Sequence, residues 1–246
     1  MISESVLYGK GVFTTIAISD GRPCLLEKHW IRLQKNAAVV SIDISGLRKD
    51  CLLDEIEKSV ERNKLINGRV RITILDESSS QLWSHEKYGE TRFSVITGEL
   101  RPVHACFSLT ISPFPANSRS PLAGIKSCNY LEPIMSLDEA KGRWFHEAVR
   151  VNERGFVTSA CMANVFWVKG GRLFTPSLTT GCLAGTTREF VLENLDCREV
   201  EVGIEALNDA EAIFLTSAGI GVVQVAKFEE RQLDRVDHPI LHLLPY

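Results

Sequence analysis

The chain has 246 residues, a length that allows one large domain or two compact domains with well-filled cores. Its hydrophobic content of 44% and its charged content of 24% are typical of a soluble globular protein. The net charge of −3 and the scattered basic residues argue against a protein that binds nucleic acid or an anionic membrane surface.

Targeting and metal-binding patterns are also missing from the sequence. No apolar run approaches the ~20 residues of a membrane-spanning helix, and residues 1–5 have neither the basic nor the apolar region of a secretory signal. The seven cysteines form no CxxC pair, and no His/Cys/Asp/Glu cluster has zinc-like spacing. We therefore expect a cytoplasmic protein with reduced thiols, without a bound metal, and without a membrane or nucleic-acid partner.

The first part of the chain mixes strands with amphipathic helices. Residues 12–19 predict a strand, and Asp20-Gly21 predicts a hairpin turn after it. Apolar residues three or four apart predict helices over about 26–40 and 46–64. Alternating apolar residues predict further strands at 70–75, 93–96 and 107–111.

A segment rich in proline and serine, residues 112–121, predicts a boundary between two domains. We place an N-terminal α+β domain at 1–114, a linker at 115–121 and a C-terminal domain at 122–246. The elements predicted in the C-terminal domain are a helix over 130–145, hairpins that turn at 152–155 and 169–171, a helix from about 185, and strands at 199–203, 211–216 and 221–228. Strands dominate without a regular βαβ order, which predicts a two-domain α+β protein.

Lys126 is the most informative residue, because it is the only charged residue between Leu122 and Ser127. A lysine amine becomes a nucleophile when burial or a nearby cation lowers its pKa from ~10.4, so a neutral surrounding sequence favours a Schiff-base lysine. Further along, Gly185-Thr186-Thr187 predicts a helix start whose amides and hydroxyls can bind an anion. The turn Ser217-Ala218-Gly219, after a strand, offers a second set of donors.

Each of these features has an ordinary structural explanation: a solvated lysine, a helix N-cap and the end of a strand. Together they describe one ligand, an aldehyde that also carries a phosphate. Pyridoxal phosphate has this chemistry.

The chain resembles the class IV aminotransferase family of fold type IV pyridoxal-phosphate enzymes, which includes branched-chain and D-amino-acid aminotransferases and 4-amino-4-deoxychorismate lyase. The resemblance extends from Tyr8-Gly9 to near Gln224. The local match is closest to the lyase, in Phe13-Thr14-Thr15, Leu122 to Lys126, Asn129, Leu131-Glu132 and Ala163 to Trp167. The resemblance implies the two-domain α+β fold of D-amino-acid aminotransferase, with barrel-like strands in a C-terminal pyridoxal-phosphate-binding domain. It also implies a homodimer with its site at the domain interface.

The resemblance implies how the cofactor is held. Lys126 would bind the aldehyde and then carry protons as the freed amine. Arg32 would hold the phosphate together with Thr186, Thr187 and Ser217. Tyr130 would hydrogen-bond the phenolic oxygen of the cofactor.

The resemblance also implies a substrate pocket lined by Phe13, Thr15 and Ala218. Phe13 and Thr15 would point into it from one face of their strand, since alternate residues share a face. Thr15 would act in catalysis by positioning or relaying a proton.

Ser159 stands where the family has a glutamate, five residues before Asn164, that pairs with the pyridine nitrogen of the cofactor. A hydroxyl can make only a neutral hydrogen bond there, so the ring is expected to be a weaker electron sink. We hypothesise that this replacement impairs transamination more than elimination.

The favoured function is a pyridoxal-phosphate-dependent lyase in folate precursor synthesis, which eliminates pyruvate from the small amino-acid-like molecule aminodeoxychorismate and leaves 4-aminobenzoate. One alternative is an aminotransferase acting on D-amino or branched-chain amino acids. The other is a family member that has lost catalysis. Ser159, Asp76 and the short N-terminus make this last alternative plausible. The acidic pair Asp76-Glu77 stands where the resemblance to aminotransferases implies an arginine, and it would repel a substrate carboxylate. Arg71 and Lys10 are the other cations that we consider for that carboxylate.

Overall fold

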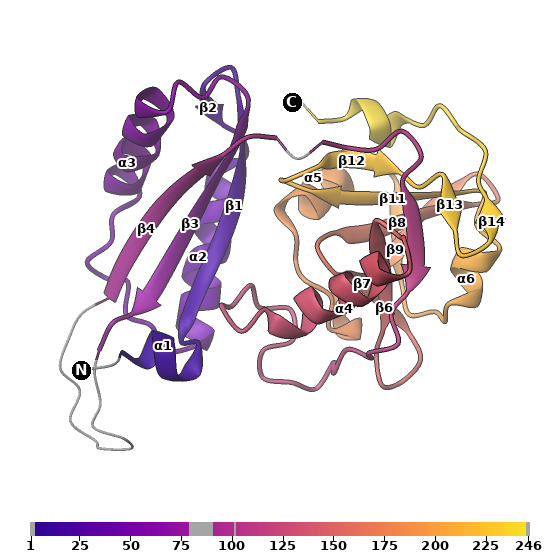
Figure 1. The fold of residues 1–246 in the computed structure, drawn as a ribbon, viewed down its shortest axis with the longest axis horizontal. Helices are drawn as coiled ribbons and strands as arrows, with labels where there is room; N and C mark the ends of the chain where they lie inside the picture. The colour runs from indigo at the N-terminus through magenta and orange to yellow at the C-terminus, as the bar shows by residue number, and fades with distance from the viewer. Residues whose placement is uncertain (1–2, 79–90, 101, 245–246) are drawn as a thin grey trace. The chain divides into compact units, whose positions relative to one another are not determined.

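The computed structural model describes residues 3–78, 91–100 and 102–244 of the chain (Figure 1). The described residues form two compact units: residues 3–78 and 91–100 together with 125–130, and residues 102–124 together with 131–244. This division differs from the predicted domains 1–114 and 122–246. Strand β5 (Ser108–Ile111) pairs with strands of the second unit, so residues ahead of the predicted linker 115–121 belong to that unit. Lys126, predicted within the C-terminal domain, belongs to the first unit.

The first unit contains a four-stranded antiparallel sheet in the order β2-β1-β3-β4. Its elements are α1 (Glu4–Tyr8), β1 (Gly11–Ser19), β2 (Arg22–Pro23), α2 (Leu26–Val39), α3 (Lys49–Arg62), β3 (Gly68–Asp76) and β4 (Thr91–Gly98). The predicted turn between β1 and β2 is present: Asp20 and Gly21 both have positive φ, at 49° and 73°. Positive φ at both central residues is what a type I′ hairpin turn requires.

The two faces of β1 have different surroundings. Val12, Ile16 and Ile18 pack with α2 and α3 in the apolar core of the first unit. Because side chains alternate along a strand, Phe13 and Thr15 lie on the opposite face. Their neighbours on β3 are Thr73 opposite Phe13 and Arg71 opposite Thr15. This second face carries most of the candidate site of the unit.

The second unit contains two five-stranded sheets, in the orders β10-β9-β8-β11-β12 and β14-β13-β5-β6-β7 (Figure 1). Its other elements are α4 (Leu131–Gly142), β6 (Glu147–Val151), β7 (Val157–Ala160), β8 (Asn164–Lys169), β9 (Arg172–Pro176), α5 (Thr186–Asn194), β10 (Cys197–Val200), α6 (Glu205–Asn208), β11 (Ala212–Ser217), β12 (Gly221–Gln224), β13 (Lys227–Phe228) and β14 (Arg231–Gln232), with 3-10 helices at Leu178–Thr180 and Pro239–His242. Leu109 and Val149 from one sheet share a core with Val165, Ile213 and Leu215 from the other. The barrel-like strands expected here are thus two sheets around one core.

The single strand predicted over 221–228 is wrong. The chain first pairs with β11 as β12, and the amide of Val225 still donates to the carbonyl of Ile213 in β11. The chain then leaves this sheet, since the amide of Ala226 donates to the carbonyl of Phe107, next to β5. It continues as β13 beside β5 in the other sheet. Val223, Val225 and Phe228 all face the shared core, so the spacing of two residues becomes three at the crossing, but the sequence does not specify which strands the two segments pair with.

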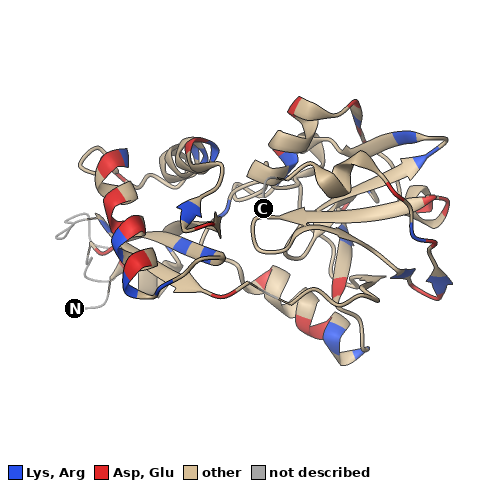
Figure 2. Cartoon of the chain, turned by 90° about the horizontal axis from the view of Figure 1, so that it is seen from above, with Lys and Arg blue, Asp and Glu red and all other residues tan. Residues whose placement is uncertain are grey.

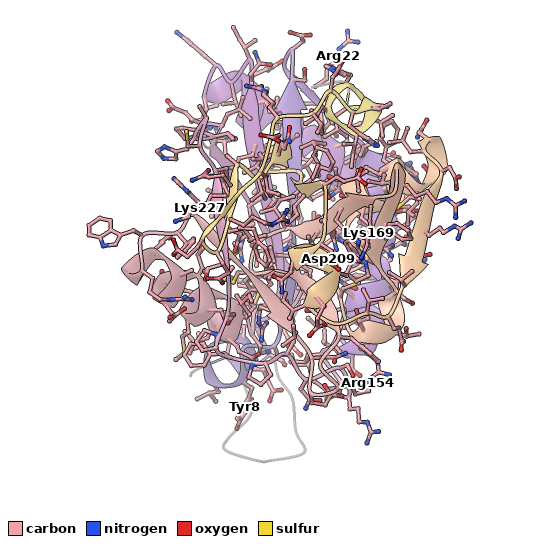
Figure 3. The ribbon with its side chains drawn as sticks, turned by 90° about the vertical axis from the view of Figure 1, so that its right-hand side faces the viewer. Tyr8, Arg22, Arg154, Lys169, Asp209 and Lys227 are labelled. Carbon is pink, nitrogen blue, oxygen red and sulfur yellow. The ribbon has the colours of Figure 1, made fainter. Side chains whose placement is uncertain are left out.

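Charged residues of both signs are interspersed over the described chain (Figure 2). One exposed example is the ion pair between Lys169 and Asp209, with a nitrogen–oxygen distance of 3.0 Å (Figure 3). Such surface pairs contribute little to stability. Among the described helices, none has the length and apolar character that a bilayer crossing would need.

Candidate functional site

The segment 125–130 runs alongside β1, and this pairing places Lys126. The amide of Phe13 donates to the carbonyl of Lys126 at 3.0 Å, and the amide of Cys128 donates to the carbonyl of Gly11 at 2.8 Å. A Cβ atom on Gly11 would lie 2.8 Å from Cys128 Sγ and 2.7 Å from a methyl carbon of Leu75, so a larger residue at position 11 would displace these side chains. The backbone of Lys126 is therefore fixed to the edge of the sheet.

Two aromatic rings and an arginine surround the Lys126 amine. Lys126 Nζ lies 4.6 Å from the centre of the Phe13 ring and 4.7 Å from that of Tyr130. It donates a hydrogen bond to Tyr130 Oη at 3.3 Å. The guanidinium of Arg71 lies over the Phe13 ring, 3.7 Å from its centre. Phe13, Tyr130 and Arg71 thus come together around the lysine.

These surroundings disfavour the charged form of the amine. Burial, followed by the positive charges of Arg32 and Arg71, lowers the pKa of Lys126 to about 7. A substantial fraction of the amine is then unprotonated at neutral pH. Lys126 has the properties of a nucleophile, and of a group that can both accept and donate a proton near pH 7.

We expect the rate at which Lys126 captures pyridoxal to rise tenfold per pH unit below about 7 and to level off above about 8, because only the neutral amine reacts. The measurement is the amount of borohydride-trapped adduct on the peptide that contains residue 126, as a function of pH. Arg71→Leu removes a neighbouring cation, so the midpoint should move to higher pH. A wild-type rate that still rises tenfold per unit above about pH 9 would show an ordinary lysine.

Arg32 lies on α2, next to two buried polar residues that the sequence analysis did not single out. Arg32 Nη2 donates to Thr14 Oγ1 at 2.6 Å, and Thr14 Oγ1 lies 2.7 Å from His29 Nδ1. Thr14 and His29 are fully buried. Burial, together with the charges of Arg32 and Lys126, lowers the pKa of His29 well below its ordinary value. The imidazole is therefore neutral at neutral pH.

The acidic pair Asp76-Glu77 has partners within the first unit. Lys10 Nζ lies 2.7 Å from a carboxylate oxygen of Asp76, and Ser5 donates to Glu77 at 3.0 Å. The pairing offsets the charge of Asp76 and weakens the expected repulsion of a substrate carboxylate. Of the two cations considered for that carboxylate, Lys10 is held by carboxylates of its own unit, whereas Arg71 lies beside Lys126.

In the second unit, Asn164 fixes the turn before α5. Asn164 Nδ2 donates to the carbonyl of Leu183 at 2.8 Å. A Cβ atom on Gly185 would lie 2.0 Å from Asn164 Oδ1, so only glycine fits at this N-cap. Thr186 and Thr187 follow as the first residues of the helix and are buried. The amides of a helix start, with two threonine hydroxyls, form a donor set suited to a phosphate.

Ser217 is the last residue of β11, the strand that pairs with β8 at Asn164, and Ala218 follows it. Thr216, the residue before Ser217, is the cross-strand partner of Asn164. The Ser217 hydroxyl accepts a hydrogen bond from the amide of Gly219 at 3.3 Å, which closes the turn. Since Asn164 pairs with Thr216 near the end of β11 and holds the loop before α5, the second unit places the Ser217 turn near the Thr186-Thr187 helix start.

Ser159 lies on β7, directly opposite Arg150 on β6. The buried Arg150 guanidinium pairs with the carboxylate of Glu132 and donates to the carbonyl of Pro115 at 3.4 Å. The side chains of opposed residues in an antiparallel pair lie on the same face, about 5 Å apart at Cβ. The cation Arg150, which the sequence analysis did not anticipate, thus lies opposite Ser159, the position where the resemblance implies a glutamate.

The sequence matches the family model described as Amino-transferase class IV over residues 11–228. The chain belongs to the class IV aminotransferase family. Within this family, it is 28% identical to the aminodeoxychorismate lyase of Bacillus subtilis over 233 residues, which cover 91% of this chain and 79% of that protein. It is 25% identical to a putative branched-chain-amino-acid aminotransferase of Methanocaldococcus jannaschii over 244 residues, 95% of this chain and 84% of that one.

A solved structure shows the same class IV aminotransferase fold. The putative 4-amino-4-deoxychorismate lyase of Legionella pneumophila matches with a TM-score of 0.87 and 24% identity, over 98% of this chain and 91% of that one. The predicted family and its two-domain α+β fold are confirmed. Class IV aminotransferase proteins are pyridoxal-phosphate-dependent enzymes, so the predicted enzyme class and cofactor are confirmed as well.

Proposed function

We propose that this pyridoxal-phosphate-dependent enzyme is a lyase of the 4-amino-4-deoxychorismate type, which eliminates pyruvate and leaves 4-aminobenzoate for folate synthesis. The observation that carries the proposal is Ser159 opposite a buried Arg150, which leaves no carboxylate in this pair to hold a proton on the pyridine nitrogen. The relative from Bacillus subtilis supports the same activity.

The residues of both units fit the cofactor chemically. Pyridoxal phosphate supplies a conjugated ring that withdraws electrons from the substrate carbon next to the bound amine. Lys126 is the proposed ligand of the aldehyde, since its pKa of about 7 leaves neutral amine available. Arg32 is the proposed phosphate ligand in the first unit, and Tyr130 the partner of the phenolic oxygen. The proposed ligands in the second unit are Thr186, Thr187 and Ser217 for the phosphate and Ser159 for the ring nitrogen.

Within the first unit, the face of the sheet around Lys126 is the proposed substrate surface. Lys126 would take a proton from the substrate and return one, because its pKa lies near the working pH. Phe13 would exclude water, and Thr15 would position or relay the proton. Arg71, opposite Thr15 on this face, is the proposed ligand of a substrate carboxylate. Ala218 is the proposed pocket residue from the second unit.

We also propose a cytoplasmic homodimer. All seven cysteines are free, as is usual for proteins of a reducing compartment. On α4, the apolar side chains of Leu131, Ile134 and Met135 are exposed at helical spacing, as at a surface that a second copy covers. Light scattering of the purified protein would give the mass of a dimer.

The deciding experiment supplies aminodeoxychorismate to the protein loaded with pyridoxal phosphate. Pyruvate and 4-aminobenzoate should appear in equal amounts, with pyruvate measured by lactate dehydrogenase and NADH. The second candidate is an aminotransferase, which the Methanocaldococcus relative favours. It would instead show rapid conversion of the cofactor to its amine form by D-alanine or a branched-chain amino acid, without pyruvate release from aminodeoxychorismate. A protein that takes up no pyridoxal phosphate would contradict both.

A further inference from the structure

We infer that Thr14 and His29 are positioning residues for Arg32, holding its guanidinium in the orientation that receives the phosphate of the cofactor. The inference rests on the proposed role of Arg32 as phosphate ligand and extends it to two buried residues. It concerns contacts within the first unit alone.

The fold brings the three side chains together from two elements. Thr14 lies on the face of β1 that packs against α2, opposite to the face of Phe13 and Thr15. His29 and Arg32 are three residues apart on α2 and therefore share one side of that helix. Thr14 Oγ1 lies between them, 2.6 Å from Arg32 Nη2 and 2.7 Å from His29 Nδ1. Both distances are at the short end of the normal range.

The direction of the two hydrogen bonds follows from the chemistry of the groups. A guanidinium can only donate, so Thr14 Oγ1 accepts from Arg32. The hydroxyl proton of Thr14 then needs an acceptor, and His29 Nδ1 is within reach. Nδ1 can accept because burial keeps the imidazole neutral, which places the ring proton on Nε2. The chain of donors runs from Arg32 through Thr14 to His29.

This arrangement orients the arginine. The Thr14 hydroxyl is neutral, so its hydrogen bond restrains the guanidinium without itself offsetting the positive charge that would attract a dianion. The same charge also lowers the pKa of Lys126. The orientation of Arg32 therefore serves the phosphate, whereas the amine depends only on the nearby charge.

The test measures the dissociation constants of pyridoxal phosphate and of pyridoxal, which lacks the phosphate, by absorbance titration. Thr14→Val, which keeps the shape and removes the hydroxyl, should weaken pyridoxal phosphate binding about tenfold. Thr14→Ser should bind within about twofold of wild type, since it keeps the hydroxyl. Pyridoxal should bind all three proteins with similar affinity. The control Thr175→Val removes another buried threonine hydroxyl, which donates to Val165 at 2.9 Å in the second unit, and should bind pyridoxal phosphate as wild type does.

A second pair of variants covers the case in which Thr14→Val does not fold. His29→Asn keeps an acceptor near the position of Nδ1 and should retain affinity, whereas His29→Leu should lose several-fold. Equal affinity of wild type, Thr14→Val and His29→Leu for pyridoxal phosphate would overturn the inference, as would a loss that is the same for pyridoxal. Failure of the wild-type protein to bind pyridoxal phosphate would overturn the proposed function, and this inference with it.

Discussion

Lys126→Ala is expected to abolish covalent capture of pyridoxal phosphate and to lower kcat of the lyase reaction by at least about 10²–10⁴-fold. The amine is the proposed ligand of the aldehyde and the proposed carrier of the substrate proton, and loss of a positioned proton carrier alone has an effect of that size. The measurements are the visible absorbance band of the loaded protein, its mass after borohydride reduction, and the rate of pyruvate release.

The matched control for this variant is Lys141→Ala. Lys141 is an exposed lysine on α4 whose amine lies 3.8 Å from Asp138, so its removal should leave the band, the mass increase and the rate unchanged. Non-covalent binding of the phosphate should persist in Lys126→Ala, because the proposed phosphate ligands are intact. A borohydride-stable adduct of equal yield on Lys126→Ala would place the reactive amine elsewhere and would falsify the proposed role.

Much of the first unit could be predicted because its patterns are local. Alternation along β1 and apolar residues three or four apart on α2 and α3 arise from the geometry of one element facing one core. The return of residues 125–130 to this unit could not be predicted, since it depends on backbone pairing with β1, far away in the sequence. The change of sheet between β12 and β13 is hidden for the same reason.

The candidate site divides in a similar way. Lys126 attracts notice because charge is absent from its own neighbourhood in the sequence, and family resemblance supplies the rest. Thr14 and Arg150 could not be recognised from the sequence, because their roles depend on partners in other elements. Thr14 contacts His29 and Arg32, and Arg150 lies opposite Ser159 and pairs with Glu132. One sequence pattern could have indicated the Thr14 contacts. His29 and Arg32 are three residues apart on a predicted helix, and Thr14 is a polar residue on the core face of the predicted strand before it.

The contacts of Asp76 and Glu77 also differ from what the sequence indicates. Two acidic residues in sequence indicate a negative surface, yet Lys10 and Ser5 meet them within the unit. The net field at a site depends on pairing, which the order of residues does not specify.

Ser159→Glu alone is expected to raise the rate of the half-transamination with D-alanine by less than about threefold. The new carboxylate would lie opposite Arg150, and an ion pair with that guanidinium would lower the pKa of the carboxyl and make it a poor acceptor for the proton of the ring nitrogen. Ser159→Glu combined with Arg150→Leu should raise the rate about tenfold or more, because the carboxylate is then available to the ring. The conversion of the cofactor band by D-alanine in single turnovers measures both rates.

Arg150→Leu by itself is the control for the combined variant and should give no gain in transamination. The free energy of unfolding of this variant should be only slightly lower than that of the wild type, since the side chain of Glu132 is 60% exposed and can be hydrated after its partner is lost. The buried Arg150 position accepts an apolar side chain without leaving an unpaired charge. A tenfold gain in the single Ser159→Glu variant would show that Arg150 does not control the position. If the double variant shows no gain, Ser159 does not limit transamination, and the case for elimination as the favoured reaction loses its main support.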